Sequence, residues 1–476
     1  MTEELVQWVN RIVLGYFALI LVSYSGVTFL SWIQVRRYYR RRVHARLQRS
    51  VRSRLTPPIS ICTAAYNEAE VIVDAMRSML SLRYPEHEIV LANDGSTDTT
   101  LERMIEAFAM YRVDQPEHAR LETAAVRGVW RSRTHSNLMI VDKENGGKCD
   151  ALNAAINFAR YPLVCCVDAD SLLEPEALVT VVRPFIERPD RTIAAAGIIR
   201  IANGCEVTRG HVTKVGLPRQ WLPMCQTVEY LRAFTAARTG WSLVNSLLIV
   251  SGAFGIFRKD AVIDVGGYAT DTIGEDFELI VRMHRRMREL KRPYHIAFVP
   301  DPVCWTEAPV NLGQLGGQRD RWHRGLTDTL VRHRRMIGNP RYGVVGVIGL
   351  PFFVLFEFLG AFIEAAGYVI LPFGFVFGYL DASAAALFLT LAIGSGVSLS
   401  LSALLLEDMA FKKFGRWRDF GRLVLFCVIE NFGYRQLMTY YRVRGFVSYM
   451  RGDHGWGHID RAGFAPDTLQ PDVGMR

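Results

Sequence analysis

The 476-residue chain is predicted to be an α/β protein, with a doubly wound, mostly parallel sheet held between membrane-spanning helices. Three observations predict this class. Short apolar runs alternate with helical patterns from residue 58 to about residue 192, which is typical of a parallel sheet covered by helices. Uncharged stretches before and after this region are long enough to cross a bilayer. Half of all residues are hydrophobic.

The N-terminal stretch predicts a retained membrane anchor. Ile12–Ile33 carries no charge, and Arg36–Arg54 follows with nine arginines and no acidic residue. A signal peptide has its basic residues first, so this order excludes one, and the positive-inside rule places the arginines in the cytosol. Such a run could also bind nucleic acid, but the adjacent span favours a membrane surface. We expect an anchor at 1–35, a basic cytosolic linker at 36–57 and no nucleic-acid partner.

The sheet domain is predicted to cover residues 58–340. Short apolar runs predict strands at Ile59–Ala64, Glu88–Ala92, Leu138–Val141, Leu163–Val167 and, interrupted by small residues, Leu248–Phe257. Apolar residues at helical spacing predict helices over Ile72–Leu80, Leu101–Phe108 and Cys149–Ala159. Consecutive strands separated by helices should pair in parallel, with their carboxyl ends at one edge.

Two carboxylates follow the most apolar of these strands. Leu163–Val167 leads directly into Asp168 and Asp170. Open α/β sheets bind ligands at the carboxyl ends of their strands. Hard divalent cations such as Mg²⁺ or Mn²⁺ take one or two carboxylates together with substrate phosphates. Two acids at this spacing also form ordinary polar turns, so the metal interpretation depends on the other motifs.

Six short motifs occur in one order along the chain. They are Ala65-Tyr66-Asn67-Glu68, Asn93-Asp94-Gly95-Ser96, Lys148 with Ala151-Leu152-Asn153, Asp168-Ala169-Asp170, Gly274-Glu275-Asp276 and Gln318-x-x-Arg321-Trp322. Together they resemble the processive family 2 glycosyltransferases, which include cellulose, chitin, hyaluronan and poly-N-acetylglucosamine synthases. The resemblance covers about Pro58–Gly325 and the flanking membrane segments. It implies a GT-A-type nucleotide-sugar-binding domain inserted between transmembrane helices.

The resemblance also implies a role for each motif. The donor is a UDP-sugar, and its binding residues are Ala65, Tyr66, Glu68, Asp94, Lys148, Asp168, Gln318, Arg321 and Trp322. The divalent cation, Mg²⁺ or Mn²⁺, is held by Asp170 and Asp168. The acceptor lies against Trp322, Ser251 and Gly252. Alone, Lys148 would be a solvated lysine at a helix start, and Arg321 and Trp322 a surface arginine and an interface tryptophan.

By the same resemblance, Asp276 is the base that takes the proton from the acceptor hydroxyl, and Glu275 orients it. Read by itself, this acidic pair is also typical of a helix N-terminus, where carboxylates interact favourably with the dipole. No second nucleophile is evident in the sequence, so we expect a single displacement with inversion. An α-linked donor would then give a β-linked product.

The C-terminal region, 341–445, is predicted to hold membrane or interfacial helices. Gly343–Leu380 and Ala382–Leu406 form an out-and-back hairpin whose end near Lys412 is cytosolic. Leu423–Tyr441 is apolar but carries charges, and it either crosses the membrane or lies at the interface. Residues 446–476 are expected to be a cytosolic tail.

Two acidic residues in this region, Glu357 and Glu364, are seven residues apart and share a helix face. Carboxylates at membrane depth usually face a polar interior. We therefore expect this face to line a path for the nascent glycan, with Arg435 or Arg422 as partners. The alternative is a glutamate near the membrane boundary and one structural ion pair.

The expected function is polymerising sugar transfer from a UDP-sugar, with export of the product through a multi-pass protein of the bacterial inner (plasma) membrane whose catalytic domain is cytosolic. The expected partners are the donor, a glycan or lipid-linked acceptor and membrane lipid, and secretion partner proteins are left open. One alternative is a non-processive transferase that adds one or a few sugars. Another, from a different class, is an inactive secretion or scaffold subunit. The sequence leaves glucose and N-acetylglucosamine donors both open.

Overall fold

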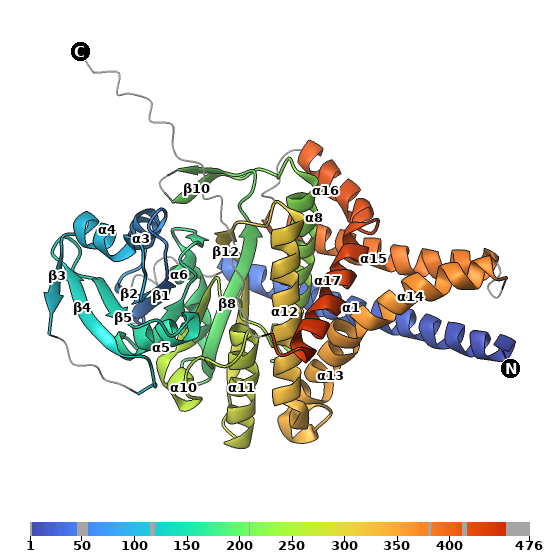
Figure 1. The fold of residues 1–476 in the computed structure, drawn as a ribbon, viewed down its shortest axis with the longest axis horizontal. Helices are drawn as coiled ribbons and strands as arrows, with labels where there is room; N and C mark the ends of the chain where they lie inside the picture. Colours follow the sequence, from blue (N-terminus) through green and yellow to red (C-terminus); the bar gives the residue numbers. More distant parts are fainter. Residues whose placement is uncertain are drawn as a thin grey trace, which may run out of the picture.

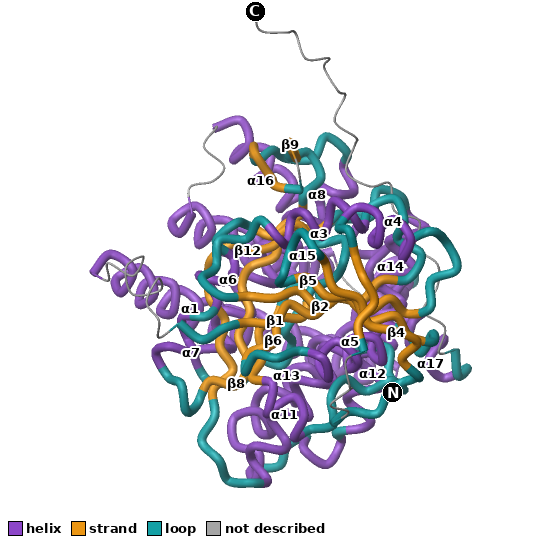
Figure 2. The backbone as a smooth tube through the Cα atoms, turned by 90° about the vertical axis from the view of Figure 1, so that its left-hand side faces the viewer, coloured by secondary structure: helices purple, strands orange, loops and turns teal. Residues whose placement is uncertain are grey.

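The structure, a computed structural model, describes residues 2–44, 56–114, 120–208, 210–378, 382–411 and 417–453. Its centre is a ten-stranded sheet with strand order β3-β4-β5-β2-β1-β6-β11-β8-β12-β7. Figure 1 shows this sheet on one side of the molecule, while α1, α14 and α15 extend away from it on the other. In Figure 2 the strands lie side by side through the middle of the molecule, with helices above and below them.

The sheet is parallel at its centre and mixed elsewhere. Its strands are β1 (Ile59–Ala65), β2 (His87–Asp94), β3 (Met110–Val113), β4 (Val126–Ser132), β5 (Leu138–Lys143), β6 (Leu163–Cys166), β7 (Leu172–Leu173), β8 (Thr192–Ile201), β11 (Gly255–Arg258) and β12 (His295–Thr306). The neighbours β5-β2-β1-β6 pair in parallel, as predicted. β3-β4, β4-β5, β6-β11, β11-β8 and β12-β7 are antiparallel. The short link between β4 and β5 permits this pairing, whereas parallel pairing needs a crossover of about a dozen residues or more.

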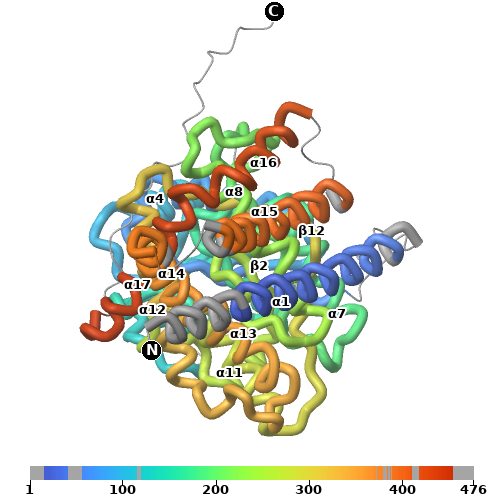
Figure 3. The backbone as a smooth tube through the Cα atoms, turned by 90° about the vertical axis from the view of Figure 1, so that its right-hand side faces the viewer, coloured from blue at the N-terminus to red at the C-terminus, as the bar shows by residue number. Residues whose placement is uncertain are grey.

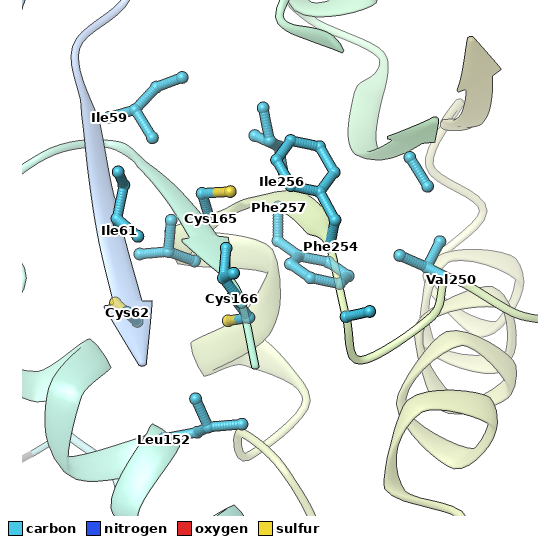
Figure 4. Close-up of a cluster of buried hydrophobic side chains, with 14 of the residues drawn as sticks. Ile59, Ile61, Cys62, Leu152, Cys165, Cys166, Val250, Phe254, Ile256 and Phe257 are labelled. Atoms are coloured by element: carbon cyan, nitrogen blue, oxygen red, sulfur yellow. The ribbon is translucent and has the colours of Figure 1, made fainter. Parts of the chain in front are cut away.

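The hydrophobic core lies where β1 and β6 meet β11. Ile59, Ile61 and Cys165 are completely buried, and Figure 4 shows their side chains facing those of Ile256 and Phe257. Burying an aliphatic or aromatic side chain of this kind contributes about 1.5–3 kcal/mol. The core therefore fixes the strands whose carboxyl ends carry the predicted site.

The predicted strand at Leu248–Phe257 is too long, because only Gly255–Arg258 is a strand. The preceding residues turn instead, and the amide of Phe254 donates to the carbonyl of Ser251 at 3.1 Å. Gly252 packs so closely against Lys148 that an added Cβ would lie 3.2 Å from its Nζ atom. An extended strand could not make this approach, and the turn presents Ser251 and Gly252 to the site.

Helices flank the sheet and carry three of the predicted motifs. They are α3 (Ile72–Leu80), α4 (Thr100–Ala107), α5 (Lys148–Phe158), α6 (Ala177–Val181), α7 (Arg183–Glu187), α10 (Lys259–Asp264), α11 (Glu275–Glu289) and α12 (Leu312–Arg332). A small hairpin, β9 (Glu206–Thr208) and β10 (His211–Lys214), lies apart from the main sheet. α5 packs on β1 and β2, so its first residue, Lys148, is held at the carboxyl edge of the sheet.

Three helices are long and apolar enough to cross a membrane: Gly15–Arg40, Val345–Val376 and Leu389–Met409. The first belongs to α1 (Thr2–His44), which continues without a break past residue 35. The second comprises η4 (Val345–Gly349), α13 (Leu350–Phe352), η5 (Phe353–Phe358) and α14 (Leu359–Val376), and the third lies in α15 (Ala382–Phe411). Figure 3 shows α15 running beside α1, and the two helices are in contact. Residues 45–55 of the predicted linker lie outside the described part of the chain.

A continuous helical segment connects the sheet to these helices. It consists of α8 (Trp221–Tyr230), the π-helical η1 (Leu231–Arg238) and α9 (Thr239–Leu243). η1 contacts α1, α15 and β8. The sheet domain and the membrane helices therefore share one packed interface.

The segment Leu423–Tyr441 is not one helix. It is divided between α16 (Trp417–Ile429) and α17 (Tyr434–Met450), with Gly433 between them at a φ of +87°. Neither helix is among the three candidate spans of the described residues. α17 packs on α12, where a Cβ at Gly445 would lie 2.7 Å from the carbonyl oxygen of Asp320. Most of the predicted tail, residues 454–476, lies outside the described residues.

Candidate active site

The parallel strands bring three of the motifs to one edge of the sheet. β1 lies between β2 and β6, with Ala65 opposite Asn93 and Cys62 opposite Cys166. The turn after β1, the loop after β2 and the Asp168 turn after β6 are therefore neighbours, as expected at the carboxyl edge of an α/β sheet.

The turn after β1 is tied to the loop after β2. Asn67, at a φ of +55°, accepts a hydrogen bond from the amide of Thr97 at 2.8 Å. The amide of Glu68 donates to the hydroxyl of Thr100 at 2.9 Å. Tyr66 is 49% exposed, so its ring is available for stacking against a planar base. This paired turn and loop form the rim of the predicted uridine site.

Asp94 has internal partners for both carboxylate oxygens. It lies at the end of β2, is almost completely buried, and accepts hydrogen bonds from Lys143 Nζ at 2.7 Å and from the amides of Gly146 and Gly147 at 3.0 and 2.8 Å. Lys143 also pairs with Asp150 at 2.5 Å. These contacts hold the loop that leads into α5. Direct binding of the donor by Asp94 stays a prediction.

Lys148 joins two acidic motifs that are far apart in the sequence. Its Nζ atom lies 2.7 Å from Asp168 and 3.1 Å from Glu275. Burial alone would lower the pKa of Lys148, but the two carboxylates raise it above its ordinary value, so the side chain is a permanent cation. Gly252 lies directly against this ammonium group and near both oxygens of Asp168. The lysine is thus fixed beside the open edge where a diphosphate would lie.

The predicted base, Asp276, lies in the first turn of α11. One carboxylate oxygen of Asp276 accepts a hydrogen bond from the amide of Phe277 at 2.8 Å, and the other accepts one from the amide of Gly252 at 3.4 Å. Burial and the carboxylate of Glu275 raise the pKa of Asp276 to about 6, although Lys148 opposes this. A carboxylate with a pKa near 6 is ionised at neutral pH and is basic enough to accept a proton.

Asp168 and Asp170 are the candidate metal ligands, and both are partly exposed. No group of three or more His, Cys, Asp or Glu side chains suited to a metal ion occurs in the described part of the chain. Mg²⁺ commonly takes one or two carboxylates and completes its shell with phosphate oxygens and water. The donor set therefore fits Mg²⁺ or Mn²⁺ bound together with a nucleotide diphosphate.

The last motif lies on α12. Arg321 and Trp322 line the cavity described below, whereas Gln318 is half-buried. Trp322 is 45% exposed, and the guanidinium of Arg319 lies 4.3 Å from its ring centroid. Arg319 in turn pairs with Glu229 of α8 at 2.8 Å. The tryptophan is therefore positioned by a buried cation and keeps an open face.

A contact between two glycines sets the distance between the acidic motif and this tryptophan. A Cβ at Gly274, the residue before α11, would lie 2.7 Å from Cα of Gly325 on α12. Only two residues without side chains allow this approach. It brings the start of α11, and with it Asp276, next to the helix that carries Arg321.

Eight of the predicted site residues line one cavity of about 550 Å³: Lys148, Asp168, Ser251, Gly252, Glu275, Asp276, Arg321 and Trp322. Ala65, Tyr66, Glu68, Asp94, Asp170 and Gln318 are not part of its lining. At one end it is lined by Lys148, Asp168, Gly252 and Asp276. At the other it is lined by side chains of α1, η5, α14, α15 and α17, among them Tyr24, Phe356, Glu357, Glu364, Gly396, Arg435 and Arg442. A single hollow thus connects the carboxyl edge of the sheet to the candidate membrane helices.

Ion pairs line the wall of this cavity. The pairs are Glu229–Arg319 at 2.8 Å, Glu430–Arg232 at 2.5 Å, Glu364–Arg435 at 2.6 Å and Glu357–Arg442 at 2.6 Å. Arg435 is thus the partner of Glu364, as expected. Arg422 instead donates to the carbonyl of Pro218 at 2.9 Å. Each carboxylate of this wall is neutralised by an arginine from another helix.

Several of these residues were not predicted from the sequence. Glu229, Arg232, Arg238 and Arg442 lie in helices without a predicted motif, and Arg319 occupies an unassigned position within the Gln318-x-x-Arg321-Trp322 motif. The available signal was a charged side chain recurring within an otherwise apolar helix, such as Glu229 and Arg232 in the segment that runs from α8 into η1. The sequence did not say which acid meets which base, because the partners come from different helices.

Residues 60–266 match the model of glycosyl transferase family 2. The chain is 30% identical over 275 residues to the poly-beta-1,6-N-acetyl-D-glucosamine synthase of Staphylococcus aureus (strain COL), and 32% identical to that of Staphylococcus epidermidis. Each alignment covers 58% of this chain and 56% of the relative, so the chain spans a little over half the length of these curated relatives. The match confirms the resemblance that the six motifs predicted.

Solved structures are also similar to the chain. A mannosyltransferase from Pyrobaculum calidifontis in complex with GDP-Man and Mn²⁺ is 17% identical, with a TM-score of 0.47 and coverage of 91% of this chain and 99% of that one. Staphylococcus aureus TarS 1–349 in complex with UDP-GlcNAc is 13% identical, with a TM-score of 0.36 and coverage of 83% and 92%.

Proposed function

We propose that this chain, which carries a family 2 glycosyltransferase domain homologous to that of poly-beta-1,6-N-acetyl-D-glucosamine synthases, is a membrane-embedded, inverting polysaccharide synthase. It transfers sugar from a UDP-sugar to a growing β-linked glycan and passes the product across the membrane. The observation that carries this proposal is the cavity that runs from Asp276 to side chains of the candidate membrane helices.

The proposed donor is UDP-N-acetylglucosamine, which the names of the relatives favour over UDP-glucose. Its uracil stacks on the exposed ring of Tyr66, within the rim formed by the β1 turn and the β2 loop. Its diphosphate lies beside Lys148, whose charge is fixed by two carboxylates. Arg321 approaches from α12 and clamps the phosphate oxygens.

The chemistry is a single displacement. The acceptor hydroxyl attacks the anomeric carbon, its proton moves to Asp276, and the bond from that carbon to the diphosphate oxygen breaks. Glu275 keeps Lys148 in place and raises the basicity of Asp276. Asp168 and Asp170 hold Mg²⁺ or Mn²⁺, which when bound neutralises the charge that develops on the departing UDP. Inversion at an α-linked donor yields a β-linked product.

The charge balance of the cavity supports the proposed export. Its lining carries seven carboxylates and seven cations, and those near the candidate membrane helices form close pairs, such as Glu364–Arg435 and Glu357–Arg442. A lining of this kind offers hydrogen bonds to sugar hydroxyls without a net charge, which suits an uncharged glycan. Carboxylates at membrane depth are costly and commonly mark a substrate path.

The proposed topology places the catalytic domain in the cytosol of a bacterium, with the N-terminus on the opposite side of the inner membrane. The arginines that follow the first candidate span support this orientation. Three crossings bring the end of α15 back to the cytosolic side. α17 then packs on α12 of the catalytic domain, which favours the interfacial alternative for this segment.

A donor panel tests the proposal. Membranes containing the chain as their only added glycosyltransferase are given UDP-N-acetylglucosamine, UDP-glucose or UDP-galactose, and UDP release and product length are measured. The proposal expects UDP release and a long polymer with UDP-N-acetylglucosamine. Products of one or a few sugars would favour the non-processive transferase, and no UDP release from any donor would favour the inactive subunit.

A further inference from the structure

One cation of the cavity wall differs from its neighbours. Of the six other cations that line the cavity, five each lie within 4 Å of a carboxylate: Lys148, Arg232, Arg319, Arg435 and Arg442. The sixth, Arg321, belongs to the predicted donor motif. Arg238, the last residue of η1, also lines the cavity but has no such ion pair among the residues that the structure describes. Charges held away from solvent are normally paired, and Arg238 is half-buried, so this guanidinium needs a separate explanation.

The surroundings of Arg238 fix the position of its side chain but leave a buried guanidinium nitrogen without a hydrogen-bond partner. Its guanidinium carbon lies 3.8 Å from the ring centroid of Phe234, one turn earlier on η1. Its Nη1 atom is buried and has no hydrogen-bond partner within the described chain. Stacking on an aromatic ring stabilises the cation but uses none of its N–H donors. The side chain is therefore pre-positioned, with free hydrogen-bonding capacity.

The location of Arg238 indicates which substrate it meets. Burial lowers its pKa to about 10, and the carboxylate of Asp276 raises it, so the side chain is charged at neutral pH. The carboxylate that interacts electrostatically with Arg238 is thus that of Asp276, the proposed base. η1 contacts α1 and α15, and Arg238 and Asp276 line the same cavity.

We infer that Arg238 is an acceptor-binding residue: its guanidinium donates hydrogen bonds to oxygen atoms of the terminal sugar and keeps the attacking hydroxyl beside Asp276. This inference rests on the proposed function. Within that function, Arg238 supplies hydrogen-bond donors to the uncharged terminal sugar of the acceptor where the glycan enters the cavity. It also keeps a positive charge beside the base.

The test compares Arg238→Gln and Arg238→Lys with the wild-type chain in the same membranes. Arg286→Gln is the matched control, because Arg286 is an arginine on α11 that pairs with Asp264 at the surface. Three quantities are measured: the affinity for UDP, the hydrolysis of UDP-N-acetylglucosamine to free sugar and UDP, and polymer synthesis. Folding is monitored by thermal unfolding of each purified variant.

The inference expects Arg238→Gln to lower polymer synthesis about 10- to 100-fold, the loss expected for hydrogen bonds from a charged donor. UDP affinity and hydrolysis should stay within about twofold of wild type, since an acceptor contact contributes to neither. Arg238→Lys should recover part of the synthesis.

Polymer synthesis within about twofold of wild type in Arg238→Gln would overturn the inference, because it would leave no measurable acceptor contact. A parallel loss of UDP affinity would also overturn it, since the arginine would then serve the donor. If Arg238→Gln unfolds, Arg238→Lys provides the test, because a lysine cannot reproduce the hydrogen-bond geometry of the arginine. Polymer synthesis at the wild-type level in Arg238→Lys would then refute acceptor binding by Arg238. A wild-type chain that releases no UDP refutes the proposed function instead.

Discussion

The protonation of Asp276 predicts a quantitative pH dependence for sugar transfer. Burial and Glu275 raise the pKa of Asp276 from 3.8 to about 6. A base must be ionised to accept a proton, so kcat/KM for the UDP-sugar should be nearly constant at neutral pH. It should fall about tenfold for each pH unit below pH 6. An aspartate with an ordinary pKa would lose no activity until about pH 4.

The substitution Glu275→Gln separates this explanation from a general effect of acid. It removes the negative charge next to Asp276 and leaves Lys148, which lowers the pKa of that base. The pKa of Asp276 should therefore fall toward 3.8, and the acid limb of the profile should move to lower pH by at most about two units. At pH 5, Glu275→Gln should retain a larger share of its own maximal activity than wild type does.

The assay is continuous detection of UDP released by purified protein in lipid nanodiscs between pH 4.5 and 9, with Asp276→Asn as the blank. Removing the general base should reduce transfer by about 10²- to 10⁴-fold. An acid limb that stays in place in Glu275→Gln would refute the coupling between the two acids. Near-normal turnover in Asp276→Asn would refute the base itself.

Three further results are expected. Gly274→Ala should destabilise the protein by about 1–3 kcal/mol, because its Cβ meets the backbone of Gly325 at 2.7 Å. As the control, Gly317→Ala on α12, where an added Cβ would have nothing within 4 Å, should be neutral or stabilising in thermal unfolding. The double substitution Glu357→Gln with Glu364→Gln should reduce exported polymer but not UDP affinity, and unchanged export would exclude a channel role. Removal of divalent metal by EDTA should stop UDP release, and Mg²⁺ or Mn²⁺ should restore it; full activity in EDTA would exclude Asp168 and Asp170 as metal ligands.

The sheet edge was predictable because its signals are local. An apolar run such as Leu163–Cys166 must be buried on both faces, and the polar residues that follow it then lie at the strand end. Asp168 and Asp276 are far apart in the sequence. Both lie in the site because Asp168 follows the end of a predicted strand and Asp276 lies at the start of a helix. Lys148 was predicted in the same way, at the first residue of α5.

The long-range pairings were not predictable in this way. Glu357 meets Arg442 only because η5 and α17 pack together, and Arg238 acquires its role only from the shape of the cavity. The antiparallel pairing of β11 and the break before Gly433 likewise depend on tertiary contacts. Hydrophobic patterns specify which side chains are buried, but not which buried charges meet.

The most direct test of the central claim uses proteoliposomes in which the catalytic domain faces outward. UDP-N-acetylglucosamine and Mg²⁺ are added outside, and the polymer is exposed to a glycosidase before and after detergent. We predict that the wild-type chain makes a long polymer inside the vesicle, which the glycosidase degrades only once detergent is present. Asp276→Asn should make no polymer. A product that is short, or that the external glycosidase digests without detergent, would contradict coupled synthesis and export.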